Sequence, residues 1–276
     1  MPAGEFARDS AVRRVSDNTW EAELSAGWCL GEIVNGGYIM AVAARALSAA
    51  LPHKDPLTVT AYYLARAVPG PARCVVEVLR TGGSVSQGMV KVIQNGEIKV
   101  QLIAIFTDRN KLSGVDRVLE KIPEMPTYEE CLSAPCPPSL TYRQRVVQNM
   151  SPANVRSLQG EPDGSGRWLG WTAFADGSAI DAFGLLLFAD GFPPPPFTLY
   201  GPSGWVPTLE LTVQIHGVPA PGPLRCMFKS DIIKNGVVEE QGLIWDSTDQ
   251  LVVGCRQTAM LRISPQAGGQ KWGVAD

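Results

Sequence analysis

The sequence has little histidine, little charge and no long apolar run, and each shortage excludes a class of protein. Its 276 residues include two histidines, charged residues make up 18%, and the formal net charge is −3. A nucleic-acid-binding protein would carry a basic stripe, so this balance argues against nucleic acid as a partner. No stretch approaches the roughly 18 unbroken apolar residues of a membrane-spanning helix. We therefore expect neither a nucleic-acid partner nor a membrane partner.

Patterns for metals, cofactors and secretion are also missing. Among the six cysteines only Cys131 and Cys136 lie close together, at a spacing unlike that of a zinc knuckle and without a histidine partner. The chain has no phosphate-binding loop, no dinucleotide fingerprint and no Gly-x-Ser-x-Gly motif. The first residues, MPAGEFARDSAVRR, lack the apolar core of a secretory signal. We expect no metal, no cofactor, reduced thiols and a cytoplasmic protein.

What the sequence does contain is an apolar helix pattern near its beginning. Apolar residues recur at steps of three and four over residues 38–51, and alanines occupy most of the opposite side. A helix that is apolar all round is expected to be buried. Asn35 offers an N-cap, Gly36 and Gly37 add flexibility, and Pro52 ends the pattern.

Strand patterns follow this helix, and a similar order of elements recurs in the second half. In the first half we expect strands at 19–26, 57–64, 73–81, 86–94 and 98–107. In the second half we expect a strand at 166–175, an apolar helix at 178–192, and strands at 208–216, 224–233, 237–246 and 250–263. Asn95-Gly96 and Asn235-Gly236 are hairpin turn signals. Prolines between the halves indicate a linker, so we expect domains at 1–110 and 151–276 joined by 111–150.

Four segments, in this order, resemble the acyl-CoA thioesterase II (TesB-like) family. They are Val34–Tyr38, Val92–Gly96, Leu209–His216 and Leu251–Arg262. The resemblance implies an α+β double hotdog, which consists of two tandem hotdog halves, each with a long buried helix wrapped by an antiparallel sheet. It also implies hydrolysis of an acyl thioester, on CoA or an acyl carrier, without a cofactor. A double hotdog is comparable to a dimer of single hotdogs, so we expect a monomer or a homodimer.

The resemblance also implies which residues activate water. The family uses a carboxylate, a hydroxyl and a glutamine, and the matching positions here are Glu210, Ser230 or Asp231, and Gln257. Glutamate at the position of the family's aspartate adds a methylene. Such a change can displace the oxygen by about 1 Å, which can cost about 10²-fold in rate.

The residues themselves leave alternatives open at these positions. Gln257 alternates with apolar residues along its strand, so it is either a structural amide that finds backbone partners or a site residue that orients water. Glu210 shares a strand face with Thr212 and Gln214, so it is either on a solvated face or a general base.

The segment Asn35-Gly36-Gly37-Tyr38 has two interpretations as well. It is either a tight turn with a helix cap, or a substrate site where free N–H groups at a helix N-terminus bind an oxyanion or a phosphate. We assign these four residues to substrate binding. Two other functions remain open. One is a hotdog scaffold that cyclises, isomerises or dehydrates a hydrophobic intermediate in secondary metabolism, and the other is a non-catalytic acyl-binding protein.

Overall fold

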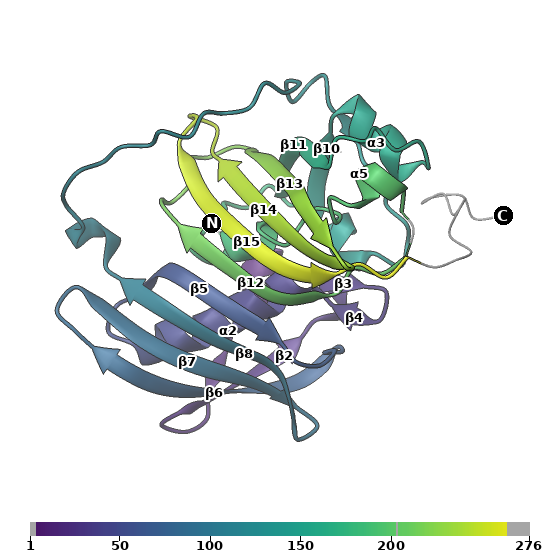
Figure 1. Ribbon diagram of the computed structural model, residues 1–276. Coiled ribbons are helices and arrows are strands. Elements are labelled where there is room, and N and C mark those ends of the chain that lie inside the picture. The colour runs from purple at the N-terminus through teal and green to yellow at the C-terminus, as the bar shows by residue number, and fades with distance from the viewer. Residues whose placement is uncertain (1–3, 203, 264–276) are drawn as a thin grey trace.

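The computed structural model describes residues 4–202 and 204–263, and a single antiparallel sheet of 13 strands dominates these residues (Figure 1). In sheet order the strands are β1 (Arg13–Arg14), β2 (Thr19–Leu24), β6 (Gly70–Thr81), β7 (Val85–Gln94), β8 (Glu97–Thr107), β5 (Asp55–Tyr63), β12 (Thr208–Ile215), β15 (Leu251–Met260), β14 (Val237–Trp245), β13 (Leu224–Lys234), β11 (Arg167–Phe174), β10 (Val146–Met150) and β9 (Leu132–Ser133). A separate pair consists of β3 (Cys29–Leu30) and β4 (Ile33–Val34).

Two of the helices, α2 and α4, pack against this sheet. The α-helices are α1 (Glu5–Asp9), α2 (Gly36–Ala50), α3 (Pro152–Leu158), α4 (Ala182–Phe188) and α5 (Phe197–Tyr200), and three short 3₁₀ helices are η1 (Ala26–Trp28), η2 (Arg109–Lys111) and η3 (Thr141–Gln144). None of the helices within the described residues is both long enough and apolar enough to cross a membrane.

The first predicted helix is α2, and it is buried along most of its length. The Asn35 side chain accepts a hydrogen bond from the Tyr38 backbone N–H and caps the helix. Strands β5 to β8 wrap around α2, as Figure 1 shows. Ala41, Ala43 and Ala44 are completely buried, and their small side chains allow the sheet to approach the helix closely.

The second half departs from the sequence prediction at its helix. A continuous helix was expected over 178–192, but α4 covers only Ala182–Phe188. The Asp181 side chain caps it by accepting from the Gly184 N–H, so the helix begins later than predicted. The predicted linker, 111–150, contains β9, η3 and β10, and its two strands join the sheet beside β11.

Two hairpin turns are confirmed at the predicted positions. Asn95 and Asn235 both have a φ of 54°, and the glycines that follow them both have a φ of 79°. Positive φ at both central residues is the geometry of a type I′ turn, whose twist matches that of the flanking strands. Asn-Gly is preferred there because both residues tolerate the left-handed region.

The two halves meet where β5 pairs with β12. Thr60 and Thr212 lie opposite each other and their hydroxyls are 2.9 Å apart. Each strand carries a register shift near its start, between Pro56 and Thr58 in β5 and between Thr208 and Glu210 in β12. The two shifts therefore occupy similar places in the two strands.

Gly37 determines how closely α2 and α4 pack. A Cβ atom at Gly37 would lie 2.7 Å from the Leu186 carbonyl oxygen and 2.8 Å from that of Leu187. These are backbone atoms, so a side chain would push the two helices apart. We expect Gly37→Ala to lower the free energy of unfolding by about 1–3 kcal/mol, measured by thermal and denaturant unfolding.

Gly83→Ala is the matched control for this substitution. Gly83 is exposed and a Cβ there would meet no atom within 4 Å. The control should leave stability nearly unchanged. Equal stability of Gly37→Ala and the original protein would show that the helices do not require this close approach.

Candidate active site

Asp190 lies two residues beyond α4, at the N-terminus of α2. Its carboxylate accepts hydrogen bonds from the Gly37 backbone N–H at 2.9 Å and from the Asn35 side-chain amide at 3.3 Å. The residue keeps some solvent exposure, although protein surrounds the carboxyl group. Burial raises the pKa of Asp190 to about 6, while the bonds from Gly37, Gly36 and Asn35 oppose that rise. This is an enclosed carboxylate of increased basicity, on a residue that is itself partly exposed.

Gly36 and Gly37 are glycines because Asp190 approaches them so closely. A Cβ at Gly36 would lie 2.8 Å from Asp190 Oδ2, and a Cβ at Gly37 would lie 2.9 Å from Asp190 Cβ. The N-terminus of α2 therefore binds an anion, as a helix N-terminus favours. In this chain the anion is the protein's own carboxylate.

Gln257 lies on the inner face of β15, with its amide held at both ends. Its Nε2 donates to Glu240 Oε2 at 2.6 Å, and its Oε1 accepts from the Thr208 hydroxyl at 3.1 Å. Gln257 is only 8% exposed. The prediction that its side chain points into the protein is confirmed, and Glu240 and Thr208 hold the two ends of the amide.

Strand register brings these partners together. Gln257 lies opposite Glu240 on β14 and opposite Leu211 on β12. Regular alternation would put Thr208 on the outer face of β12, since Leu211 points inward. The shift between Thr208 and Glu210 inserts one extra residue, so Thr208 reaches the inner face near Gln257.

Glu240 is a second buried carboxyl group in this cluster, with 5% exposure. Burial raises the pKa of Glu240 to about 8; the hydrogen bond from Gln257 opposes this rise, and the nearby Asp190 adds to it. Two carboxyl groups in one enclosed space repel each other when both are ionised. At neutral pH the arrangement favours an ionised Asp190 and a protonated Glu240.

Tyr63, near the junction of the halves, completes the cluster. It lies at the end of β5, and its side chain is partly exposed while its hydroxyl oxygen is buried without a hydrogen-bond partner. Asp190 and Glu210 both act electrostatically on this hydroxyl. The cluster thus contains carboxyl, amide and hydroxyl groups from both halves of the chain.

Glu210 is not brought together with Gln257, contrary to the sequence prediction. It lies opposite Thr258, the neighbour of Gln257, and adjacent strand residues point to opposite faces. Its Oε1 accepts from the Thr212 hydroxyl at 2.5 Å, and Thr212 in turn contacts Thr60. The alternative interpretation, a solvated strand face, describes its position better.

Ser230 and Asp231 lie at the irregularity in β13, and neither bonds to Gln257. Ser230 is buried and its hydroxyl donates to the Ile232 carbonyl at 3.4 Å. Asp231 is exposed and forms an ion pair with Lys229 at 2.6 Å. The structure supplies the hydroxyl next to Gln257 from Thr208 instead.

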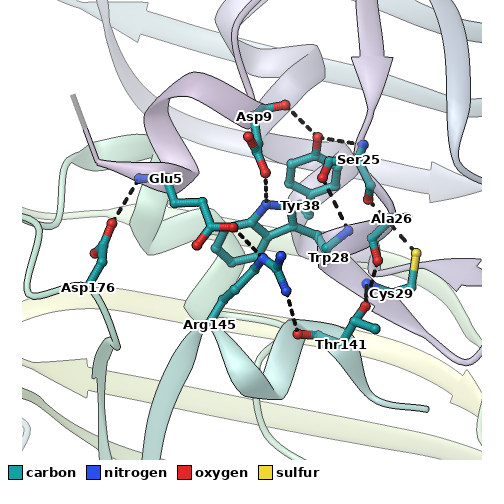
Figure 2. A network of polar contacts seen from close by, with 11 residues as sticks. Glu5, Asp9, Ser25, Ala26, Trp28, Cys29, Tyr38, Thr141, Arg145 and Asp176 are labelled. Atoms are coloured by element: carbon teal, nitrogen blue, oxygen red, sulfur yellow. Dashed lines mark hydrogen bonds and ion pairs between the residues drawn. The ribbon is translucent and has the colours of Figure 1, made fainter. Parts of the chain in front are cut away.

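Tyr38 anchors the start of α2, as Figure 2 shows. Its hydroxyl donates to the Asp9 carbonyl at 2.5 Å and accepts from the Ser25 N–H at 3.2 Å. Its ring stacks on Trp28, whose indole N–H donates to the Asp9 carboxylate. Tyr38 therefore uses its hydroxyl within the protein. Asn35 likewise uses its side-chain amide within the protein, where the oxygen caps α2 and the nitrogen donates to Asp190.

The same network joins the N-terminal segment to the second half. Arg145 Nε donates to the Glu5 carboxylate at 2.6 Å, and the Glu5 N–H donates to Asp176 at 2.8 Å. Phe6 stacks on Phe174 in the interior. These contacts hold the N-terminus of α2, and hence Gly36 and Gly37, in place relative to α4.

Comparison with known proteins identifies the family. Residues 24–107 match the model of the acyl-CoA thioesterase N-terminal domain, and residues 123–261 match that of the acyl-CoA thioesterase C-terminal domain. The chain belongs to the acyl-CoA thioesterase family. An uncharacterized protein of Mycobacterium tuberculosis is 28% identical over 92% of this chain and 94% of its own length.

Solved structures of similar proteins extend this result to the fold. A crystal structure reported as a candidate thioesterase II from Thermobifida fusca has a TM-score of 0.87 and 27% identity, over 95% of this chain and 99% of that one. A protein of unknown function with a hot dog fold, from Alicyclobacillus acidocaldarius, has a TM-score of 0.84 and 17% identity over 95% and 99% of the two chains. This acyl-CoA thioesterase family member has the hotdog fold.

Sequence reasoning missed four residues of the site in this acyl-CoA thioesterase family member, namely Asp190, Glu240, Thr208 and Tyr63. Asp190 could have been recognised as a candidate from the sequence, since it is a lone acid directly after the apolar run of α4. Glu240 lay in a predicted strand beside Glu239, and the sequence did not indicate which of the two faces inward. Thr208 could not be found by alternation, because the extra residue in β12 reverses its face.

In this acyl-CoA thioesterase family member, the corresponding strand positions of the first half hold no comparable polar side chains. Aligning the two register shifts puts Pro56 at the position of Thr208, Ala104 at that of Gln257 and Gly88 at that of Glu240. A Cβ at Gly88 would lie 2.6 Å from a methyl carbon of Leu47, so α2 fills this space. At these strand positions the polar side chains belong to the second half.

No group of three or more His, Cys, Asp or Glu side chains in residues 4–202 and 204–263 is placed to hold a metal ion. The acids of the site, Asp190 and Glu240, instead bond to amide and backbone donors. Such an arrangement can move protons and orient water.

Proposed function

We propose that this protein hydrolyses an acyl-CoA or carrier-bound acyl thioester with a water molecule that Asp190 activates. The observation that supports this function is the placement of Asp190 near Glu240, the carboxyl group that binds Gln257, while Thr208 binds the other end of the same amide, in a member of the acyl-CoA thioesterase family. A general base works best when its pKa lies near the working pH. Burial brings the pKa of Asp190 to about 6, so this carboxylate is ionised at neutral pH and more basic than an exposed aspartate.

Gln257 orients the reactants in this proposal. The oxygen of its amide accepts from Thr208, and one N–H of its amide donates to Glu240. The second N–H is left for water or substrate. Asp190 takes a proton from water as its oxygen attacks the carbonyl carbon. The C–S bond then breaks, and the proton held by Asp190 passes to the leaving sulfur. The products are a carboxylic acid and a thiol, and Asp190 is again ionised. This mechanism replaces the water-activating role that the sequence suggested for Glu210.

The test is a panel of acyl-CoA substrates that differ in chain length, with release of free thiol as the measurement. We expect turnover of at least one thioester, and a decrease in kcat of about 10²-fold in Gln257→Ala, because one positioned donor is removed. Gln214→Ala is the matched control, since Gln214 is exposed on β12. Full activity of Gln257→Ala would exclude Gln257 from the mechanism, and no turnover of any thioester would exclude the activity.

A second candidate function rests on the pair of carboxyl groups. Asp190 and Glu240 have pKa values raised to about 6 and about 8, so a base and an acid coexist near neutral pH. Isomerisation or dehydration of an acyl thioester needs such a pair, to remove one proton and deliver another. Mass spectrometry of the products distinguishes the two functions, because isomerisation and dehydration leave the thioester intact.

The domain division, the compartment and the partners of the protein follow from the same family membership as further proposals. We infer a double hotdog with an N-terminal hotdog at 1–110, a connecting segment at 111–150 and a C-terminal hotdog at 151–276. The repeated register shifts of β5 and β12 support this division. All six cysteines are free, which suits a reducing cytoplasm. The partner is a small acyl thioester, and the assembly is a monomer or a homodimer.

A further inference from the structure

The hydroxyl of Tyr63 is a buried hydrogen-bonding group without a partner inside the protein. Its oxygen is enclosed, whereas the side chain as a whole is partly exposed. Buried hydroxyls almost always have a partner in folded proteins, so an orphan needs an explanation. We propose that the Tyr63 hydroxyl donates a hydrogen bond to the carbonyl oxygen of the bound thioester and stabilises the negative charge that develops there. This inference rests on the proposed function.

The position of Tyr63 beside Asp190 supports this role. A Cβ at Gly36 would lie 2.8 Å from Asp190 Oδ2 and 3.1 Å from Tyr63 Cζ, the atom that carries the hydroxyl. The carboxylate and the phenol thus flank the same point at the start of α2. If a water bound to Asp190 attacks the carbonyl carbon of a thioester, the carbonyl oxygen would lie within reach of the Tyr63 hydroxyl.

The first N–H groups of α2 are not free to hold this oxygen. The backbone N–H groups of Gly37 and Gly36 donate to Asp190, and the backbone N–H of Tyr38 donates to the Asn35 side chain. The sequence suggested that Gly36 and Gly37 bind the carbonyl, but their donors are engaged in this way. An oxyanion therefore needs another donor, and Tyr63 is a buried donor beside Asp190.

The surroundings keep Tyr63 protonated. Burial, followed by the charges of Asp190 and Glu210, holds the pKa of Tyr63 well above its ordinary value. A hydroxyl that stays neutral donates its hydrogen, and its hydrogen bond strengthens as the carbonyl oxygen becomes negative. The bond requires no proton transfer, so Tyr63 does not compete with Asp190 for the proton of water.

Tyr63→Phe tests this role, and the chain offers an adjacent control. The variant removes only the oxygen and keeps the ring. We expect kcat for the best thioester to fall about 10²-fold, with a much smaller change in KM, as for removal of one oxyanion donor. Tyr62→Phe should keep the original kcat, because Tyr62 lies on the opposite face and is 48% exposed. An unchanged kcat in Tyr63→Phe would overturn the inference.

A binding experiment separates this inference from the proposed function. The probes are two unreactive acyl-CoA analogues, a ketone in which methylene replaces sulfur and a thioether that has no carbonyl. We expect Tyr63→Phe to weaken the ketone on the order of tenfold and to leave the thioether unchanged. Equal effects on both analogues, no effect on either, or no binding of either to the original protein would overturn the inference. If the carbonyl-dependent loss occurs but no thioester is hydrolysed, the Tyr63 contact stands and the proposed function fails.

Discussion

Replacing Asp190 with asparagine should reduce thioester hydrolysis by about 10³-fold, within the range for loss of a general base. Asparagine has the same shape, and its carbonyl oxygen can still accept from the Gly37 N–H. The fold should therefore remain, while the group that takes the proton from water is lost. The measurement is kcat at pH 8, where Asp190 of the original protein is fully ionised, since its pKa is about 6.

The pH dependence of the original protein gives a second measurement of the same residue. The base must be ionised to accept a proton, so kcat/KM should rise with pH, reach half of its plateau at about 6 and level off about one pH unit higher. This rise should be absent from the residual activity of Asp190→Asn. A flat profile in the original protein would mean that Asp190 is not the base.

Two further variants make the result decisive. Asp116→Asn alters an exposed acid of the connecting segment and should change nothing. Glu210→Gln tests the carboxylate that the sequence suggested, and it should keep most of the activity because Glu210 lies on the opposite face from Gln257. Loss of activity in Glu210→Gln together with full activity in Asp190→Asn would restore Glu210 as the base.

Glu240→Gln should stabilise the protein at alkaline pH. The pKa of Glu240 is raised from 4.5 to about 8 in the folded state, so folding favours the protonated carboxyl. The stability linked to this group is fully present below pH 4.5 and is lost as pH rises through about 8. At about 1.4 kcal/mol per pKa unit, the cost of ionising Glu240 in the folded protein is on the order of a few kcal/mol. Glutamine has the same shape, carries no charge and can still accept from Gln257.

The measurement for Glu240→Gln is the free energy of unfolding across pH. At pH 5 we expect the variant and the original protein to differ little, and at pH 9 we expect the variant to be more stable by a few kcal/mol. Glu239→Gln is the control, since Glu239 lies next to Glu240 on the opposite face and pairs with Arg256. A variant that is less stable than the original protein at pH 9 would show that ionised Glu240 stabilises the fold.

Some of this structure was determined by the sequence alone. Local rules suffice where neighbours in the chain decide the conformation, as at the cap of α2 and at the turns with Asn95 and Asn235. The apolar surface of α2 predicted its burial, because a helix without a polar face has to be covered. Gln257 was predicted to face inward by alternation, and the irregularity of β15 lies earlier in the strand, between Leu251 and Val253.

The site itself was decided by the tertiary structure. Asp190 meets Gly37 because two helices from different halves pack together, and no local pattern encodes that distance. One extra residue in β12 brings Thr208 rather than Glu210 to Gln257, and register selects Glu240 as its other partner. The physical reason is that the side-chain period of a strand is two, so a shift of one residue exchanges the faces. The sequence determined which elements form, and the packing between the halves determined which polar groups meet.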